Sequence, residues 1–245
     1  MSPPMKSTTR AGLAIAAALA LAGCQRGDEA FDKKVHAYLM EHPEVIREAV
    51  AKLQEKDQAA AQKASTDAIS KFRDRLERDP RDVVINPAGS VTVVEFFDYR
   101  CGYCKLAAPQ VLELIRDHPE VRLVFKEFPI FGEVSDTAAK VALTPQGKAK
   151  ALALYQGWMG EKALDDGSLD AHLKAAGIDP AAARKAAGDP QIARQLLDTR
   201  ALASALKIEG TPAFIIGDTL VPGADMAAVR AAVIQAKARD LRKIS

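Results

Sequence analysis

The feature that most constrains this chain is a pair of cysteines placed where a strand gives way to a helix. Residues 91–97 form a β-branched and aromatic run that predicts a buried strand. Cys101 and Cys104 follow, and apolar residues then recur at helical spacing as far as Asp117. A cysteine at a helix N-terminus meets free N–H groups and the helix dipole, which favour its thiolate. Because the thiolate is the form that attacks disulfides, the pattern indicates a redox pair.

Two other interpretations of the cysteine pair stay open at this point. A zinc site needs two more ligands, usually a second cysteine pair or two histidines at helical spacing. The four histidines of this chain are scattered along the sequence. The other alternative is an inert structural disulfide. The strand-to-helix context favours redox chemistry over both, so we predict no metal site and no bound cofactor.

The first 23 residues predict a secretory signal. Lys6 and Arg10 precede an uncharged run over residues 11–23, which is shorter than the ~20 residues of a membrane-spanning helix and fits a signal core. The run ends Leu-Ala-Gly before Cys24, which resembles the lipobox of bacterial lipoproteins, where the cysteine is lipidated. The alternative is ordinary cleavage that leaves Cys24 as a stray thiol. Lipidation would leave a single cysteine pair, as suits an oxidising compartment.

The charge balance gives no sign of nucleic-acid binding. The chain has 34 basic and 32 acidic residues. Two of the basic residues, Lys6 and Arg10, lie in the predicted signal, so the rest of the chain is balanced. A nucleic-acid-binding domain would carry a clear excess of positive charge.

The segment between the signal and the cysteines predicts two helices. The first covers residues 31–41, and the second begins at Pro43, which suits a first helical turn, and reaches Glu77. Apolar residues at helical spacing stop at Leu53, and residues 55–67 include no large apolar side chain. A polar middle of this kind is typical of a stalk. The apolar stripe before it either docks on the main domain or pairs with another copy of the chain, and we favour a homo-oligomer.

Beyond the stalk the sequence predicts a strand, a helix and a parallel strand, followed by helices. Residues 83–85 predict an edge strand, and residues 121–127 a strand parallel to that of residues 91–97. Residues 133–206 predict a helical insertion, and a hairpin and last helix follow over residues 213–239. Several residues predict where the helices of the insertion begin and end. Pro145 and Gly147 are expected to break a helix, Ser168 to cap a helix N-terminus and Gly177 to end that helix. Asp179 and Asp189 are expected to be N-caps before proline.

This order of elements resembles the thioredoxin fold with the inserted helical domain of bacterial DsbA-type proteins. The run from Phe96 to Lys105 is close to that family's active-site run, and residues 210–214, Gly-Thr-Pro-Ala-Phe, are close to its cis-proline loop. The segment ending in His-Pro-Glu-Val at residues 42–45 resembles the oligomerising extension of the ScsC-like and Com1-like branch. The resemblance implies an α/β thioredoxin fold over residues 81–245, preceded by a helical extension over residues 24–80.

The resemblance also implies roles for single residues. Cys101 would be the attacking thiol and Cys104 the resolving thiol. Independently of the resemblance, the place of Cys101 at the helix N-terminus predicts that it is the exposed, low-pKa thiol and that Cys104 is buried. Pro212 would be cis and face the sulfurs, while Thr211 and Gly210 offer backbone hydrogen bonds to an extended substrate by strand addition.

A buried acid on the central strand is implied as well. Glu95 would assist proton transfer to Cys104, with Lys126 as a possible counter-charge or else a solvated lysine. Tyr103 stands where the strongest oxidases have histidine, and with Thr211 it is similar to the isomerase branch. A neutral tyrosine stabilises a thiolate less than an imidazolium, so we expect a less oxidising couple.

The leading hypothesis is a lipid-anchored thiol–disulfide oxidoreductase that faces the periplasm from either membrane. It would act on extracytoplasmic cysteine-containing proteins together with a membrane redox partner, and isomerisation or reduction is favoured over oxidation. One alternative is a lipoprotein that binds copper or another soft metal through the same dithiol. Another is a structural surface lipoprotein with an idle disulfide. Glu95 and the loop at residues 210–212 favour catalysis, because a metal carrier needs neither.

Overall fold

The computed structural model describes residues 29–244, so the predicted signal and Cys24 lie outside the described residues. The chain divides into two compact units between Ala61 and Gln62. The described part of the first unit consists of a helix at residues 29–41 and the first half of α2 (Glu44–Glu77), and none of its side chains is fully buried. No helix among the described residues has the length and apolar character needed to cross a bilayer.

A mixed sheet forms the centre of the second unit. Its strands are β1 (Val83–Ile85), β2 (Val91–Phe97), β3 (Val121–Glu127), β4 (Ala213–Ile216) and β5 (Thr219–Pro222). The order among the described strands is β1-β3-β2-β4-β5. β2 and β3 are parallel because α3 (Gly102–Asp117) connects them as a crossover, and the other neighbours are antiparallel. The predicted strand–helix–strand unit and the predicted hairpin are confirmed.

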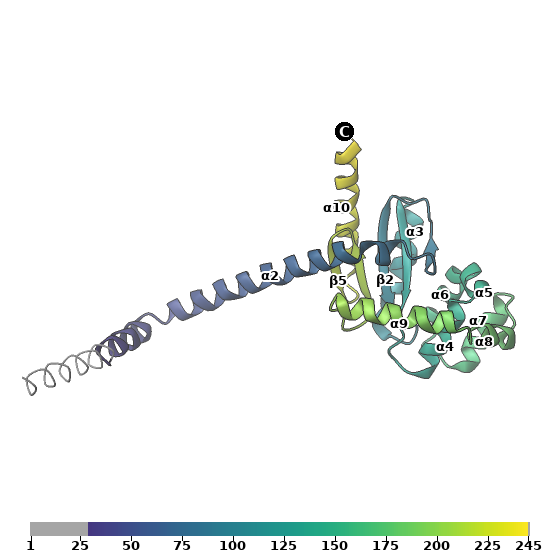
Figure 1. Ribbon diagram of the computed structural model, residues 1–245, viewed down its shortest axis with the longest axis horizontal. Coiled ribbons are helices and arrows are strands. Elements are labelled where there is room, and N and C mark those ends of the chain that lie inside the picture. Colours follow the sequence, from purple (N-terminus) through teal and green to yellow (C-terminus); the bar gives the residue numbers. More distant parts are fainter. Residues whose placement is uncertain (1–28, 245) are drawn as a thin grey trace, which may run out of the picture. The chain divides into compact units, whose positions relative to one another are not determined.

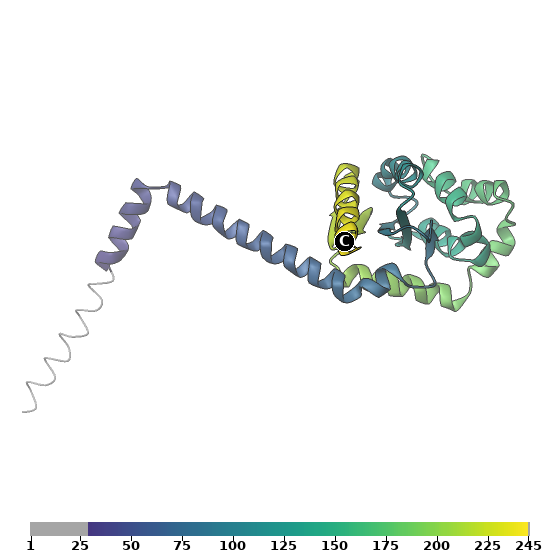
Figure 2. The same cartoon turned by 90° about the horizontal axis from the view of Figure 1, so that it is seen from above.

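Helices cover both faces of the sheet. The two further helices involved are α9 (Pro190–Ala205) and α10 (Met226–Ile244). α3 and α10 pack on one face, and the last turns of α2 lie with α9 on the other (Figure 1 and Figure 2). Side chains of β2 alternate between these layers, so Phe97 enters the first, while Phe96 packs with Ile69 and Leu76 of α2 in the second.

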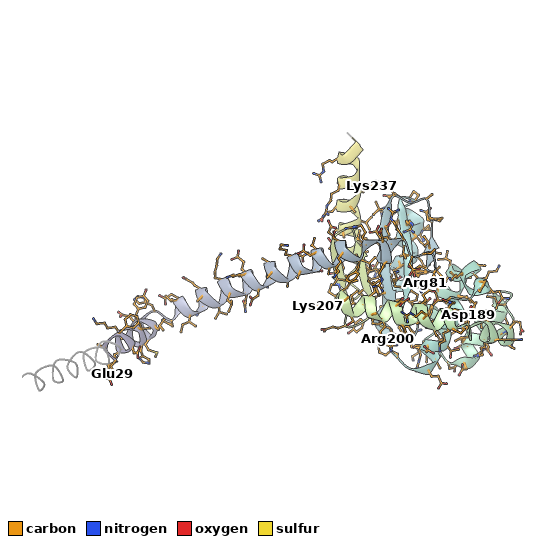
Figure 3. The ribbon with its side chains drawn as sticks, in the orientation of Figure 1. Glu29, Arg81, Asp189, Arg200, Lys207 and Lys237 are labelled. Carbon is orange, nitrogen blue, oxygen red and sulfur yellow. The ribbon has the colours of Figure 1, made fainter. Side chains whose placement is uncertain are left out.

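The predicted helical insertion is present between β3 and β4. Besides α9 it contains α4 (Glu133–Ala142), α5 (Pro145–Ala149), α6 (Ala151–Gly160), α7 (Asp166–Ala175) and α8 (Pro180–Ala186). Asp179 and Asp189 cap α8 and α9 through their side chains, as predicted. Figure 3 labels Asp189 before α9, Arg200 within it and Lys207 just after it. α9 therefore returns the chain to the loop at residues 210–212.

Three details of the insertion and the last helix differ from the sequence predictions. Asp165 rather than Ser168 caps α7, and Ser168 completes a capping box from the third helical position. Gly147 lies inside α5 rather than breaking a helix, and a Cβ there would stand 2.1 Å from the carbonyl oxygen of Val141. α10 runs on to Ile244 because its last turn contains good helix formers and no glycine or proline.

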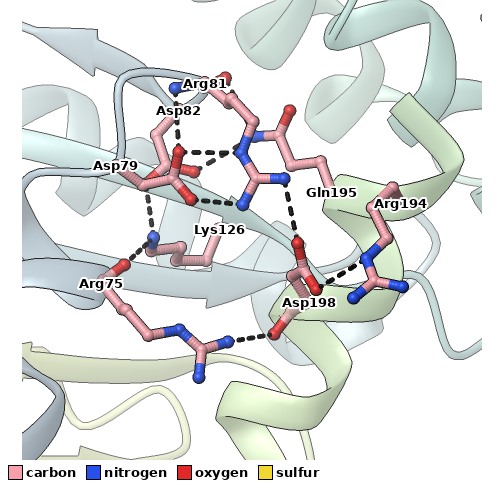
Figure 4. Close-up of polar contacts among 8 residues, drawn as sticks. All are labelled: Arg75, Asp79, Arg81, Asp82, Lys126, Arg194, Gln195 and Asp198. Atoms are coloured by element: carbon pink, nitrogen blue, oxygen red, sulfur yellow. Dashed lines mark hydrogen bonds and ion pairs between the residues drawn. The ribbon is translucent and has the colours of Figure 1, made fainter. Parts of the chain in front are cut away.

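A buried ion pair joins β3 to the entry of β1 (Figure 4). The ammonium group of Lys126 donates to the carboxylate of Asp82 and, at 2.5 Å, to the backbone carbonyl of Arg75 at the end of α2. Gln195 of α9 donates to Asp82 at 3.2 Å and to the carbonyl of Arg81 at 2.9 Å. Further contacts of the network involve Asp79, Arg194 and Asp198. The network fastens the end of α2 and α9 to the same edge of the sheet.

Candidate active site

The turn after β2 places the two cysteines at the start of α3. Cys101 is the N-cap of this helix, and its sulfur accepts a hydrogen bond from the backbone N–H of Cys104 at 3.4 Å. Hydrogen bonds lower the pKa of Cys101 to about 6. The largest cause is the hydrogen bond with the Cys104 side chain, and hydrogen bonds with Thr211 and with backbone N–H groups add to it, against the opposing effect of burial. At neutral pH the Cys101 thiolate is therefore the dominant form.

Cys101 is less accessible than the sequence predicted. Its residue is only 2% exposed, so the expectation of an exposed thiol is wrong. The reason is the loop before β4, because the carbonyl oxygen of Thr211 lies 3.2 Å from the Cys101 sulfur and covers it. A substrate sulfur has to take the place of this contact in order to reach Cys101.

Cys104 is fully buried, as predicted, and the two cysteines are not joined by a disulfide. Burial strongly raises the pKa of Cys104, and its hydrogen bond with Cys101 and the charge of Glu95 raise it further. The pKa is lowered for Cys101 and raised for Cys104, as disulfide exchange requires of an attacking and a resolving thiol.

The loop at residues 210–212 faces the cysteine turn. The Thr211–Pro212 peptide is cis, as expected, and Pro212 is buried while Gly210 is exposed. A groove of about 310 Å³ runs along this loop, lined by residues 207–213 and by Leu220, Pro222 and Gly223. Large apolar side chains stand exposed around the cysteines, and they are Tyr103, Leu106, Ile130 and Phe131. An extended apolar peptide segment suits a surface of this composition.

Glu95 lies in the water-excluded interior behind the cysteines. The hydroxyl of Tyr155, from α6, donates to its two carboxylate oxygens at 3.1 and 3.2 Å. Burial raises the pKa of Glu95 to about 8, against the lowering effect of the Tyr155 hydrogen bond. The pairing of Glu95 with Lys126 is wrong. Glu95 is in register with Phe125, so Lys126 projects to the opposite face of the sheet, where it pairs with Asp82.

Asp98, which no sequence motif singles out, clamps the turn that carries Cys101. Asp98 is buried, and one carboxylate oxygen accepts hydrogen bonds from the backbone of Arg100 and the hydroxyl of Ser135. The other accepts from the backbone N–H groups of Ile130 and Phe131, at 2.7 and 3.0 Å. Asp98 thus ties the turn to the start of the helical insertion. Two segments that lie 32 to 37 positions apart in the sequence form the clamp, so no local pattern predicts it.

A second buried acid, Glu127, also lies beside the cysteine turn without a sequence motif that marks it. Glu127, the last residue of β3, accepts a hydrogen bond at 2.9 Å from the hydroxyl of Tyr99, two positions before Cys101. From the sequence alone, a glutamate at the end of a strand is expected to be exposed to solvent. The only available signal is the neighbouring Phe128-Pro129, which ends the strand beside the cysteine turn.

Within residues 29–244 no group of three or more histidine, cysteine or acidic side chains is arranged to hold a metal ion. The two sulfurs of Cys101 and Cys104 are the soft donors that stand together here.

Fold and site define a thioredoxin-fold protein with a dithiol and a cis-proline loop. The DSBA-like thioredoxin domain model matches residues 92–235, and the model of the copper resistance protein ScsC N-terminal domain matches residues 29–60. The chain therefore belongs to the DsbA-like family and is a ScsC-like member of it.

Solved structures agree with this assignment. BcfH of Salmonella enterica Typhimurium is 31% identical with a TM-score of 0.72, covering 89% of this chain and 99% of its own. The thiol-disulfide exchange protein alpha-DsbA2 of Wolbachia pipientis is 30% identical with a TM-score of 0.66, covering 72% and 97%. A thioredoxin-like oxidoreductase of Silicibacter pomeroyi DSS-3 is 38% identical with a TM-score of 0.64, covering 67% and 97%. Membership of a thiol–disulfide oxidoreductase family follows.

Curated relatives match only a short part of the chain. Na(+)/H(+) antiporters of Salinispora tropica and Salinispora arenicola are 39% identical over 71 residues, and the chain spans 11% of their length. A match of this extent carries no transport activity over to the present chain.

The difference between the two thiols gives a first prediction. With a pKa of about 6 for Cys101, alkylation of the reduced protein by iodoacetamide should show a midpoint near pH 6, and the adduct should map to Cys101. Cys104 should stay unlabelled up to alkaline pH, because burial raises its pKa. Peptide mass mapping after brief labelling measures both. Preferential labelling of Cys104 would reverse the assignment.

The burial of Glu95 gives a prediction for stability. The folded-state pKa of Glu95 is raised from 4.5 to about 8, so the folded protein binds its proton more tightly than the unfolded chain does. Stability from this group is fully present below pH ~4.5 and is lost as pH rises through about 8. Glu95→Gln removes this dependence, so relative to wild type the variant should gain up to roughly 5 kcal/mol between those limits. Urea unfolding in reductant measures it, and a pH-independent difference would contradict it.

Proposed function

We propose that this protein is an extracytoplasmic thiol–disulfide oxidoreductase that reduces or isomerises wrong disulfides in other proteins. The observation that carries the proposal is the pair of unlike thiols at the start of α3. Cys101 is a stabilised thiolate next to the cis-proline loop, and Cys104 is a buried thiol with Glu95 behind it. The pair has the asymmetry that stepwise disulfide exchange needs.

The proposed reaction begins at Cys101. Its thiolate attacks one sulfur of a substrate disulfide, forms a mixed disulfide and releases the other sulfur as a thiolate. In reduction, the Cys104 thiol gives its proton to the carboxylate of Glu95 and attacks the Cys101 sulfur. The Cys101–Cys104 bond forms, the second substrate thiolate leaves, and the two electrons have passed to the substrate.

Isomerisation uses the same mixed disulfide but ends differently. A second thiolate of the substrate attacks the mixed disulfide instead of Cys104, so that Cys101 leaves as a thiolate and the protein stays reduced. Tyr103 supports this direction, because a neutral, 67% exposed side chain adds no positive charge to hold the thiolate. A less oxidising couple favours the reduced state that isomerisation needs.

The proposal is tested with ribonuclease in two starting states. Scrambled ribonuclease mixed with the reduced full-length protein should regain activity, and reduced ribonuclease mixed with the oxidised protein should regain it more slowly. Glu95→Gln should slow the resolution of mixed disulfides and flatten its pH profile. Faster oxidation than isomerisation would make the protein an oxidase, and failure of both assays would reject the oxidoreductase.

We further propose that the first unit makes the protein a homo-oligomer. Between residues 29 and 61 seven large apolar side chains are exposed: Phe31, Val35, Tyr38, Met40, Ile46, Val50 and Leu53. None of the residues described in this segment is fully buried, so the stripe has no core of its own. A second copy of the same helix supplies a matching apolar face, and linked active sites favour rearrangement within one substrate.

The oligomer is tested with matched charge variants of α2. Ile46→Lys with Leu53→Lys places two charges on the apolar stripe and should give a monomer by light scattering. Ala51→Lys with Gln58→Lys adds the same charge at exposed positions on the other side of the helix and should leave the oligomer intact. A wild-type protein that is already monomeric removes this part of the proposal without touching the chemistry of Cys101.

We also propose that lipid at Cys24 anchors the protein to a membrane facing the periplasm, where a membrane redox partner keeps Cys101 and Cys104 reduced. The support is the apolar run that ends Leu-Ala-Gly before Cys24. Mass spectrometry of the mature N-terminus should find a lipidated Cys24. A free thiol there, or cleavage at another site, would reject the anchor.

A further inference from the structure

A second buried carboxyl lies beside the exchange site and has no part in the reaction described above. Glu127 is 3% exposed, and Tyr99 donates to its Oε1 atom at 2.9 Å. The Oε2 atom is enclosed and meets no hydrogen-bond partner among the residues that the structure describes. An ionised carboxylate in this position would hold an uncompensated buried charge, so the neutral acid is strongly favoured. Burial accordingly raises the pKa of Glu127 well above its ordinary value.

Glu127 and Glu95 occupy one face of two neighbouring parallel strands. Glu95 is opposite Phe125 and Phe97 is opposite Glu127, so the two acids are offset by two positions. Strand spacing and rise place their Cα atoms roughly 8 Å apart. The two acids thus face the same water-excluded layer of the core.

A tyrosine holds each acid, and one aromatic ring contacts both tyrosines. Tyr155 binds Glu95, and Tyr99 binds Glu127. The ring of Phe97 packs edge-on against both tyrosines, with centroids 5.0 Å from Tyr99 and 5.4 Å from Tyr155. The ring of Phe97 therefore contacts the tyrosine of each acid–tyrosine pair.

The other acids near Glu127 have partners of their own. The titratable groups coupled to Glu127 are Tyr99, Asp98, Glu95 and Tyr155 on its own face of the sheet and, more weakly, Asp82 on the opposite face. Asp98 accepts four hydrogen bonds, and Asp82 is paired with Lys126. In the described part of the chain, neither Glu95 nor Glu127 forms an ion pair with a basic side chain. Glu95 and Glu127 are thus left without a cationic partner among the described residues, and the charge of Glu95 raises the pKa of Glu127 further.

We propose that Glu127 is a positioning residue that works as a neutral acid, and that Glu95 and Glu127 titrate as one coupled pair. The proposal rests on the proposed function, in which Glu95 takes the proton of Cys104. Two like charges at this separation inside the core repel strongly, so the pair carries at most one charge over the working range. Glu95 ionises first because Tyr155 donates to both of its oxygens, and Glu127 keeps its proton. The charge that accepts the Cys104 proton is thereby confined to the acid beside that sulfur.

Infrared spectroscopy of the reduced full-length protein tests the pair directly. Protonated carboxyls give a carbonyl band that glutamine does not, so Glu95→Gln and Glu127→Gln assign the two bands. At pH 7 both bands should be present, and only the Glu95 band should fade as pH rises through about 8. In Glu95→Gln the midpoint of the Glu127 band should fall by roughly one pH unit or more, because its like-charged neighbour is gone.

Two further variants separate coupling from a packing role. Glu127→Gln keeps an acceptor for Tyr99 and should retain the exchange rate and its pH profile, whereas Glu127→Ala should slow exchange. Tyr99→Phe removes the hydrogen bond to Glu127 and should move its midpoint further up. An ionised Glu127 at pH 7, or a midpoint that Glu95→Gln leaves unmoved, overturns the proposal. If the wild-type protein shows no disulfide exchange, the proposed function is rejected, whereas the infrared test of the coupled titration of Glu95 and Glu127 remains valid.

Discussion

Cys101→Ser is expected to abolish disulfide exchange, with a loss on the order of 10³-fold or more, because a serine hydroxyl is not ionised at neutral pH and cannot replace the thiolate. Cys104→Ser is expected to behave differently. It keeps the attacking thiolate but removes the resolving thiol, so the protein should accumulate as a mixed disulfide with its substrate. Intact-mass measurement under non-reducing conditions detects the adduct, and turnover of a fluorescent disulfide measures the rate.

The two cysteine variants control for each other. A trapped adduct with Cys104→Ser but not with Cys101→Ser assigns the attack to Cys101, and the opposite pattern would exchange the two roles. Leu197→Ser, at an exposed position of α9, should turn over as the wild type does. Equal residual activity in both cysteine variants would mean that the dithiol is not the reacting group.

The second large effect is expected from the ion pair of Lys126 and Asp82. Lys126→Met removes one partner of a pair whose side chains are each 2% exposed, and it leaves the Asp82 carboxylate buried with Gln195 as a partner. Breaking a buried pair from one side destabilises a protein by about 3–5 kcal/mol. That loss is a large share of the 5–15 kcal/mol that is typical of a folded domain. Urea unfolding at pH 7 measures it.

A double variant and an exposed pair provide the controls. Lys126→Met combined with Asp82→Leu removes both charges and should be more stable than Lys126→Met alone. Lys63→Met breaks the exposed pair with Asp67 and should change stability by less than about 1 kcal/mol. The penalty of Lys126→Met should shrink as pH falls towards 4, because Asp82 then becomes neutral. A penalty that matches that of Lys63→Met would show that Lys126 bears no structural load.

The strands and caps that follow local rules were predictable from the sequence. The β-branched run of β2 has the predicted bounds, and α8 and α9 begin at the predicted aspartate caps, because periodicity and capping act over a few residues. The N-cap of α7 was placed at Ser168 because serine suits that position. Only the hydrogen bonds of the folded turn distinguish it from Asp165.

The site was predictable to the extent that it lies on one continuous stretch. The cysteine turn follows from the residue pattern of β2 and α3, whereas the burial of Glu95 was implied by the family resemblance. The pairing of Glu95 with Lys126 failed because the register between two strands decides which residues share a face, and the sequence does not give that register. Tyr155 is 60 positions from the acid it binds, so no local pattern connects them.

The end of α2 limits how short this protein can be made. Ile69 and Leu76 are buried against the sheet, and the carbonyl of Arg75 accepts from Lys126. A chain trimmed to begin at residue 81 would lose both side chains, and each large-to-small loss in a core costs ~2–5 kcal/mol. Such a fragment would lack much of its folding free energy although every residue of the cysteine turn remained. The sequence predicts α2 to be a stalk outside the catalytic domain, but its last turns form part of the core of that domain. A gene fragment that encodes the catalytic part therefore has to start near Gln62.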